Sequence, residues 1–304
     1  MKVVEPALLQ QVLQGGQDAT PGTRTGPAIL VGLIGRGIQA SLSPRMHEAE
    51  GARLGFRYIY KLIDLDPLGL DVGALPDLVL AAERLGFTGL NITHPCKEAV
   101  LACLDELSPD AAAIGAVNTV VFAGGRRAGH NTDCWGFAES FRRRMPHVAR
   151  GRVLQLGAGG AGMAVARALL ELGVGRLAIY DPDHAKAAAL AAALCRQFSP
   201  GRAEAVEAAE TAARQADGIV NASPVGMAKY PGSPLSPAVL QPSQWVADII
   251  YFPAETEFLR EARAKGCATM PGSGMAIHQA VKAFELFTGV APDAEAMARE
   301  FAAA

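Results

Sequence analysis

The sequence feature that most constrains the fold is the run RVLQLGAGGAG at residues 152–162. This run contains a short apolar strand followed by the spacing G-x-G-x-x-G. An apolar helix comes next, and a second strand follows at 176–181. This order is the pattern of a dinucleotide-binding βα unit. The glycines allow a tight turn and let backbone N–H groups approach a pyrophosphate at the positive end of the helix. An ordinary glycine-rich turn is the alternative interpretation. The predicted cofactor-binding residues of this loop are Gly157, Ala158, Gly159, Gly160, Ala161 and Gly162.

The second strand of this unit ends at Asp181, 24 positions after Gly157. That spacing is near the ~20 residues expected for the carboxylate that binds the adenosine ribose. A carboxylate there accepts hydrogen bonds from a ribose 2′-hydroxyl and repels a 2′-phosphate, and no arginine occurs in the stretch Asp181-Pro182-Asp183-His184. The sequence therefore predicts NAD as the cofactor, with NADP less favoured. The alternative is that Asp181 only caps the following helix.

Strands alternating with helices along most of the chain predict an α/β fold with mostly parallel sheets. Strands are expected at 29–35, 58–64, 86–93, 152–156, 176–181, 218–223, 245–251 and 267–271, with a hairpin turn at Gly124-Gly125. Helices are expected at 44–55 (with Ser43 as N-cap and Pro44 in the first helical position), 76–85, from Pro95 to about Leu104, from Asp133 to about Arg144, and at 184–197.

A chain of 304 residues favours two domains over one. We expect a leader at 1–28 with a short helix at about 6–14, then an α/β substrate-binding and catalytic domain at 29–145. A Rossmann NAD-binding domain is expected at 146–272, and a C-terminal helix from about 273–304 is expected to pack back on the first domain.

Charge and composition argue against several classes of protein. The formal net charge is −2 with no basic stripe, so nucleic acid is an improbable partner. No apolar run approaches the ~18 residues of a membrane-spanning helix. Five cysteines without C-x-x-C spacing predict neither a disulfide scaffold nor a zinc site, so we expect no metal and a reducing cytoplasm.

Beyond the glycine loop, seven ordered motifs lie between about residues 29 and 290. They are Ser41-Leu42-Ser43-Pro44, Asn91-Ile92-Thr93-His94-Pro95-Cys96-Lys97, Ala116-Val117-Asn118-Thr119-Val120, Gly129-His130-Asn131-Thr132-Asp133, Asn221-Ala222-Ser223-Pro224-Val225-Gly226-Met227, Asp248-Ile249-Ile250-Tyr251 and Gly272-Ser273-Gly274-Met275-Ala276-Ile277-His278-Gln279-Ala280. Their order and spacing resemble those of shikimate dehydrogenases and quinate/shikimate dehydrogenases. Such enzymes move a hydride between a nicotinamide and the C3 carbon of a cyclic hydroxy acid.

The resemblance implies that Lys97 and Asp133 are catalytic. An ammonium group can give a proton to the developing alkoxide, and a carboxylate can orient the lysine and the substrate hydroxyl. Taken without the resemblance, Lys97 is a surface charge in a first helical turn and Asp133 is a helix cap.

The resemblance also implies a pocket of short polar groups, which suits a polyhydroxy acid as the small-molecule substrate. Ser41 and Ser43 match the serines that bind the carboxylate, and Ile249 and Gly272 match backbone positions near the nicotinamide. The remaining implied substrate-binding residues are Asn91, Thr93, Asn118, Tyr251 and Gln279.

Two departures from the commoner biosynthetic pattern look like the NAD-using branch. Ala40 stands where a histidine precedes the first serine, and Asp181-Pro182-Asp183 stands where an Asn-Arg-Thr element holds the NADP phosphate. We therefore expect a monomeric or homodimeric oxidoreductase that interconverts shikimate and 3-dehydroshikimate, quinate and 3-dehydroquinate, or both. The same two departures argue against a housekeeping role in aromatic amino-acid biosynthesis (the shikimate pathway). The alternatives are an NADP-dependent shikimate dehydrogenase, an enzyme for an aminoshikimate-type analogue, and a non-catalytic ligand-binding regulator.

Overall fold

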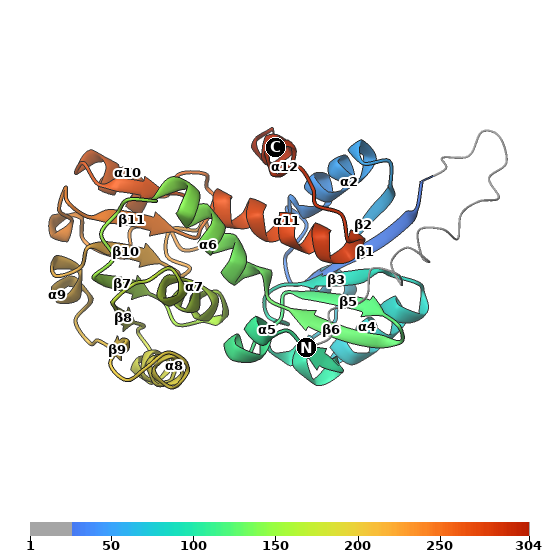
Figure 1. The fold of residues 1–304 in the computed structure, drawn as a ribbon, viewed down its shortest axis with the longest axis horizontal. Helices are drawn as coiled ribbons and strands as arrows, with labels where there is room; N and C mark the ends of the chain where they lie inside the picture. Colours follow the sequence, from blue (N-terminus) through green and yellow to red (C-terminus); the bar gives the residue numbers. More distant parts are fainter. Residues whose placement is uncertain (1–25, 304) are drawn as a thin grey trace. The chain divides into compact units, whose positions relative to one another are not determined.

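The computed structural model describes residues 26–303, and their contacts divide the chain into two units (Figure 1). Unit 1 holds residues 26–108, 117–130 and 280–303, and unit 2 holds residues 109–116 and 131–279. The helix predicted at about 6–14 lies outside the described residues.

Unit 1 is built on a six-stranded sheet with the strand order β2-β1-β3-β5-β6-β4. The pairs β1·β2, β1·β3 and β4·β6 are parallel, and β5 runs antiparallel to both of its neighbours. The strands are β1 (Ala28–Gly35), β2 (Arg57–Asp64), β3 (Gly89–Ile92), β4 (Glu106–Leu107), β5 (Thr119–Ala123) and β6 (Arg126–His130). The helices are α2 (Ser43–Arg53), α3 (Leu65–Leu68), η1 (Val72–Ala74), α4 (Leu75–Arg84), η2 (Ala99–Cys103), α12 (Ala294–Ala302) and the second half of α11 (Ser273–Thr288).

The core of unit 1 forms where α11 packs against the sheet. Phe284 and Phe287 join the apolar residues of β1 and β2 in one buried cluster. Gly89 permits this contact, because a Cβ atom there would lie 2.5 Å from the Phe287 ring. The predicted hairpin is present at Gly124 and Gly125, whose positive φ angles of 58° and 72° suit the tight turn between β5 and β6.

Unit 2 is built on a six-stranded parallel sheet with the order β12-β11-β10-β7-β8-β9. The strands are β7 (Arg152–Leu156), β8 (Arg176–Tyr180), β9 (Ala203–Ala205), β10 (Gly218–Asn221), β11 (Trp245–Asp248) and β12 (Ala268–Met270). The helices are α5 (Pro109–Ile114), α6 (Thr132–Arg144), α7 (Gly160–Glu171), α8 (His184–Gln197), α9 (Ala209–Arg214), η3 (Pro237–Val239), α10 (Glu257–Ala264) and the first half of α11.

The strand order of unit 2 is that of the Rossmann fold, in which the order reverses between the first and fourth strands. Here those strands are β7 and β10, and the glycine loop follows β7. The predicted fold class, an α/β substrate domain with a mostly parallel sheet plus a Rossmann domain, is confirmed.

The division into units differs from the boundary near residues 145–151 that the sequence suggests. Helix α6 belongs to unit 2, because Phe137 and Phe141 on its apolar face are fully buried in the same cluster as Val153 of β7. The Phe141 ring also meets Trp245 of β11 edge-on, with 5.0 Å between the ring centroids.

Two local predictions are wrong. No α-helix opens at Pro95: the segment forms turns followed by the short 3-10 helix η2, and the Lys97 carbonyl accepts a hydrogen bond from the Val117 N–H instead of from a later helical turn. Ser43 is not the N-cap of α2, because Leu42 occupies that position without a side-chain cap and Ser43 is the first helical residue.

Candidate active site

The predicted substrate-binding residues of unit 1 gather at one edge of its sheet. The parallel strands β1 and β3 end there, and the antiparallel strand β5 begins there at Thr119. The Ile92 N–H donates to the Asn118 carbonyl over 2.8 Å, and the Thr93 N–H donates to the Ile34 carbonyl over 2.9 Å. The structure therefore brings Asn91, Thr93 and Asn118 to a common edge.

The loop that carries the two serines follows β1 and is held by Asp64 at the end of β2. The Asp64 carboxylate accepts hydrogen bonds from the Gly37 N–H (2.9 Å), the Ile38 N–H (3.0 Å) and the Gln39 side chain (2.9 Å). Burial raises the pKa of Asp64, but these hydrogen bonds outweigh it and hold that pKa below its ordinary value. A charged anchor thus fixes the loop that leads into Ser41.

Ser41 and Ser43 are both half-buried and lie next to each other at the start of α2. The Ser41 hydroxyl oxygen accepts a hydrogen bond of 3.4 Å from the Ser43 N–H. Serine hydroxyls placed this closely can both donate to a single carboxylate group.

Lys97 lies in the turn after β3, five residues beyond the end of that strand. The turn is fixed by backbone hydrogen bonds from Cys96 to the Thr93 carbonyl (2.8 Å) and from Arg36 to the His94 carbonyl (3.0 Å). The Lys97 side chain is half-buried.

In unit 2 the glycine loop has the form that a pyrophosphate requires. Gly157 has φ +100°, and a Cβ atom there would lie 2.7 Å from the Ala222 backbone. A Cβ atom at Gly162 would lie 2.5 Å from the Gly157 carbonyl oxygen. A Cβ atom at Gly159 or Gly160 would meet nothing within 4 Å, so no other part of the protein crowds the loop at the start of α7. These residues fit a dinucleotide.

A buried glutamine supports this loop from below. The Gln155 side-chain N–H groups donate to the carbonyls of Gly157 (2.8 Å) and Gly162 (2.9 Å), so both ends of the loop are tied to β7. The sequence reasoning missed this residue. Its signal was a lone polar side chain inside the apolar strand RVLQL.

Asp181 lies beside the glycine loop, and one of its carboxylate oxygens accepts a hydrogen bond of 2.8 Å from the Ala158 N–H. Its other oxygen accepts a hydrogen bond of 2.9 Å from the Asp183 N–H. The alternative role of Asp181 as the cap of α8 is wrong, because Asp183 caps that helix by accepting from the Ala185 N–H.

The loops after β10 and β11 meet at the same edge as the glycine loop. Buried Asp248 accepts hydrogen bonds from the side chains of Asn221 (3.1 Å) and Thr256 (2.8 Å) and from the Ile250 N–H (3.0 Å). Burial raises its pKa to about 6. Ile249 and Gly272 are neighbours here, since a Cβ atom at Gly272 would lie 2.3 Å from the Ile249 carbonyl.

Asp133 lies in the first turn of α6 and is 7% exposed. It does not cap the helix: the Asn131 side chain accepts from the Asp133 N–H (3.1 Å) and the Cys134 N–H (3.3 Å). Tyr251 is 45% exposed. Its pKa is raised mainly by partial burial and to a smaller extent by the negative charge of Asp133. The two side chains therefore lie within electrostatic reach of each other.

Gln279 comes close to the same helix. Gly136 lies one turn after Asp133, and a Cβ atom at Gly136 would lie 2.7 Å from the Gln279 backbone nitrogen. The absence of a side chain at Gly136 lets α6 and α11 approach closely, so the Gln279 backbone lies against α6 within one turn of Asp133. Lys97 belongs to unit 1 and Asp133 to unit 2.

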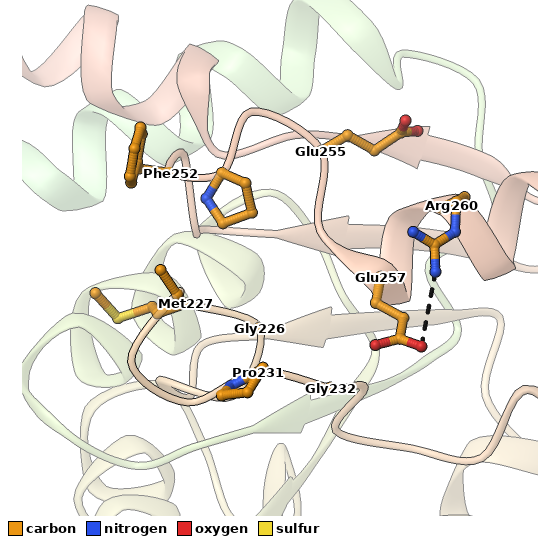
Figure 2. A pocket seen from close by; sticks show the side chains of 10 residues that line it. Gly226, Met227, Pro231, Gly232, Phe252, Glu255, Glu257 and Arg260 are labelled. Atoms are coloured by element: carbon orange, nitrogen blue, oxygen red, sulfur yellow. Dashed lines mark ion pairs between the residues drawn. The ribbon is translucent and has the colours of Figure 1, made fainter.

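A separate pocket in unit 2 is bounded by the loop containing Gly226 and Gly232 on one side and by the segment from Phe252 to Glu257 on the other (Figure 2). The ion pair between Glu257 and Arg260, 3.6 Å long, lies at its rim. None of the site residues predicted from the sequence lines this pocket.

Among residues 26–303, no group of three or more histidine, cysteine, aspartate or glutamate side chains is arranged to hold a metal ion. Within the same range, no helix has both the length and the apolar character needed to span a bilayer.

Two models of known protein families match parts of the chain. Residues 33–120 match the family model described as the shikimate dehydrogenase substrate binding domain. Residues 272–300 match the model described as the shikimate 5'-dehydrogenase C-terminal domain.

Individual relatives are similar over nearly the whole chain. A shikimate dehydrogenase (NADP(+)) of Streptomyces avermitilis is 56% identical, over 91% of this chain and 96% of the relative. A quinate/shikimate dehydrogenase (NAD(+)) of Corynebacterium efficiens is 47% identical, over 90% and 98%. The solved structure of quinate dehydrogenase from Corynebacterium glutamicum in complex with NAD superposes with a TM-score of 0.87 at 46% identity, covering 91% of this chain and 99% of that one.

Proposed function

The chain belongs to the shikimate dehydrogenase family of oxidoreductases, and within it we propose that this enzyme is an NAD-preferring quinate/shikimate dehydrogenase. It interconverts the C3 hydroxyl and the C3 ketone of shikimate, quinate or both. The observation that carries the NAD preference is the carboxylate of Asp181 beside the glycine loop.

The charges around Asp181 support NAD over NADP. A 2′-phosphate carries about −1.5 to −2 charges at neutral pH and is repelled by a nearby carboxylate. Asp183 adds a second carboxylate two residues on, and Lys186, the first cation after it, has its ammonium group 3.7 Å from the Asp183 carboxylate. No arginine or lysine lies between Asp181 and Lys186 to neutralise an added phosphate.

When bound, the nicotinamide supplies or accepts the hydride at C3. We propose that Lys97 gives a proton to the oxygen that becomes the hydroxyl and takes it back in the oxidative direction. Asp133 accepts a hydrogen bond from the reacting hydroxyl, and its burial strengthens that interaction by excluding water.

The other predicted site residues hold the hydroxy acid or the cofactor. Ser41 and Ser43 donate hydrogen bonds to the carboxylate, while Asn91, Thr93, Asn118, Tyr251 and Gln279 bind ring hydroxyls or border the pocket. Ile249 and Gly272 contact the nicotinamide through their backbone.

A second candidate, an NADP-dependent shikimate dehydrogenase, is favoured by the 56% identity to the Streptomyces avermitilis protein. Steady-state rates with shikimate and quinate, each with NAD and NADP, decide between the two. We expect kcat/KM with NAD to exceed that with NADP by more than tenfold. A ratio near or below one supports the second candidate, and a protein that turns over neither acid with either cofactor is not the proposed enzyme.

A further inference from the structure

Tyr60 is a buried tyrosine of β2 that none of the seven motifs includes. The register of the sheet pairs Tyr60 with Val31 and Asn91 with Leu33. Because Val31 and Leu33 lie on one face of β1, Tyr60 and Asn91 face the same side of the sheet from the two strands that flank β1. Tyr60 is 5% exposed.

The Tyr60 hydroxyl donates a hydrogen bond of 2.7 Å to the side-chain oxygen of Asn91. The Asn91 amide nitrogen, on the opposite side of the group, donates to the Thr119 hydroxyl over 3.1 Å and to the Asn118 carbonyl over 3.3 Å. Because an amide nitrogen can only donate and an amide oxygen can only accept, these partners permit one orientation of the Asn91 side chain.

Burial raises the pKa of Tyr60 far above its ordinary value, so the hydroxyl keeps the hydrogen that it donates to Asn91.

We propose that Tyr60 is a positioning residue that orients Asn91, which binds a ring hydroxyl. This inference rests on the proposed function of Asn91. Tyr60 does not touch the reacting atoms, and it acts by fixing the orientation of the Asn91 side chain.

Tyr60→Phe removes the hydroxyl that donates to Asn91 and keeps the ring, and Tyr58→Phe is its matched control. Tyr58 lies two residues away on the same strand, is 8% exposed, and has its hydroxyl 2.9 Å from the His47 ring nitrogen Nδ1. We expect Tyr60→Phe to raise the KM for the hydroxy acid about three- to tenfold, the range for one neutral hydrogen bond. The KM for NAD and kcat are expected to stay within twofold, and Tyr58→Phe is expected to change neither KM.

A Tyr60→Phe enzyme with wild-type KM, or one matched by Tyr58→Phe, overturns the inference. If Tyr60→Phe folds poorly by thermal melting, Thr119→Val replaces it, removes the next contact of Asn91, and is expected to raise the same KM. Turnover by the wild type distinguishes failure of the proposed function from failure of the inference about Tyr60. An inactive wild type overturns both. An active wild type, together with a Tyr60→Phe variant whose KM for the hydroxy acid is unchanged, overturns only the inference about Tyr60.

Discussion

The carboxylate of Asp181 accepts a hydrogen bond of 2.8 Å from the backbone N–H of Ala158, so the end of β8 is tied directly to the glycine loop. A carboxylate has about four acceptor sites, and the Asp183 N–H occupies one more. Asp181 is thus held in place and still has lone pairs for hydroxyl donors. Binding of a ribose there requires little reorganisation of the protein.

Replacement of Asp181 tests the cofactor preference. Asp181→Ala is expected to shrink the NAD-to-NADP ratio of kcat/KM, because both the ribose hydrogen bonds and the repulsion of a 2′-phosphate are lost. Asp181→Asn keeps an acceptor for Ala158 but removes the charge, so it isolates the repulsion. Steady-state kinetics with both cofactors give the ratios. If both variants keep the wild-type ratio, Asp181 does not set the preference.

Replacement of Lys97 tests the proton transfer. We expect Lys97→Ala to lower kcat by about 10²–10⁴-fold, the range for a general acid–base group, with a much smaller change in the dissociation constant of the hydroxy acid. Lys61, an exposed lysine of β2, provides the control variant Lys61→Ala with unchanged kcat. Near-normal turnover by Lys97→Ala would exclude it as the proton donor.

The two serines are tested together. Ser41→Ala combined with Ser43→Ala is expected to raise the KM of the hydroxy acid at least about tenfold, because hydrogen bonds to charged groups contribute ~1.5–3 kcal/mol each. The KM for NAD serves as the internal control and stays constant, since both serines belong to unit 1 and the glycine loop to unit 2. Equal increases of the two KM values would point to a general loss of structure.

His47 makes the free energy of unfolding depend on pH below neutrality. Burial lowers its pKa from 6.5 to about 3, so the folded state resists protonation that the unfolded chain accepts. Stability is full above about pH 6.5 and falls as the pH decreases toward 3, with a slope approaching ~1.4 kcal/mol per pH unit. Urea unfolding of the wild type and of His47→Gln at pH 7, 5.5 and 4 measures this slope. We expect it to be shallower in the variant, and parallel curves would contradict the assignment.

Asp248 acts in the opposite direction. Its folded-state pKa is raised from 3.8 to about 6 by burial. Its contribution is therefore fully present below about pH 4 and is lost as the pH rises through 6. Asp248→Asn cannot ionise, so its stability relative to the wild type is expected to improve between pH 4 and 6. A difference between the two proteins that is constant with pH would show that Asp248 does not titrate in this range.

The Rossmann unit could be predicted from the sequence because its signals are local. The strand of residues 152–156, the glycine loop and Asp181 lie within 30 residues of one another, and each has a distinctive residue pattern. Helix α8 begins and ends at the residues expected, 184 and 197.

The parts that could not be predicted depend on contacts between distant residues. Pro95 suggests a helix start, but the backbone after it pairs with Val117, twenty residues downstream of Lys97. Ser43 suggests a cap, but the helix already includes Ser43, so Leu42 holds the cap position. In the sequence, Tyr60 looks like an ordinary residue of an apolar strand. Its role could not be predicted because its partner Asn91 lies 31 positions away along the chain.

The chain passes from one unit to the other four times, after residues 108, 116, 130 and 279. A single proteolytic cut therefore cannot release either unit as one continuous fragment. Recombination between related genes that exchanged only the segment 131–279 would leave residues 109–116 behind, separated from the core into which Ile114 packs. Because the two units alternate along the chain, evolution can change the cofactor preference more easily by a few point substitutions in the loop after β8 than by exchange of whole domains.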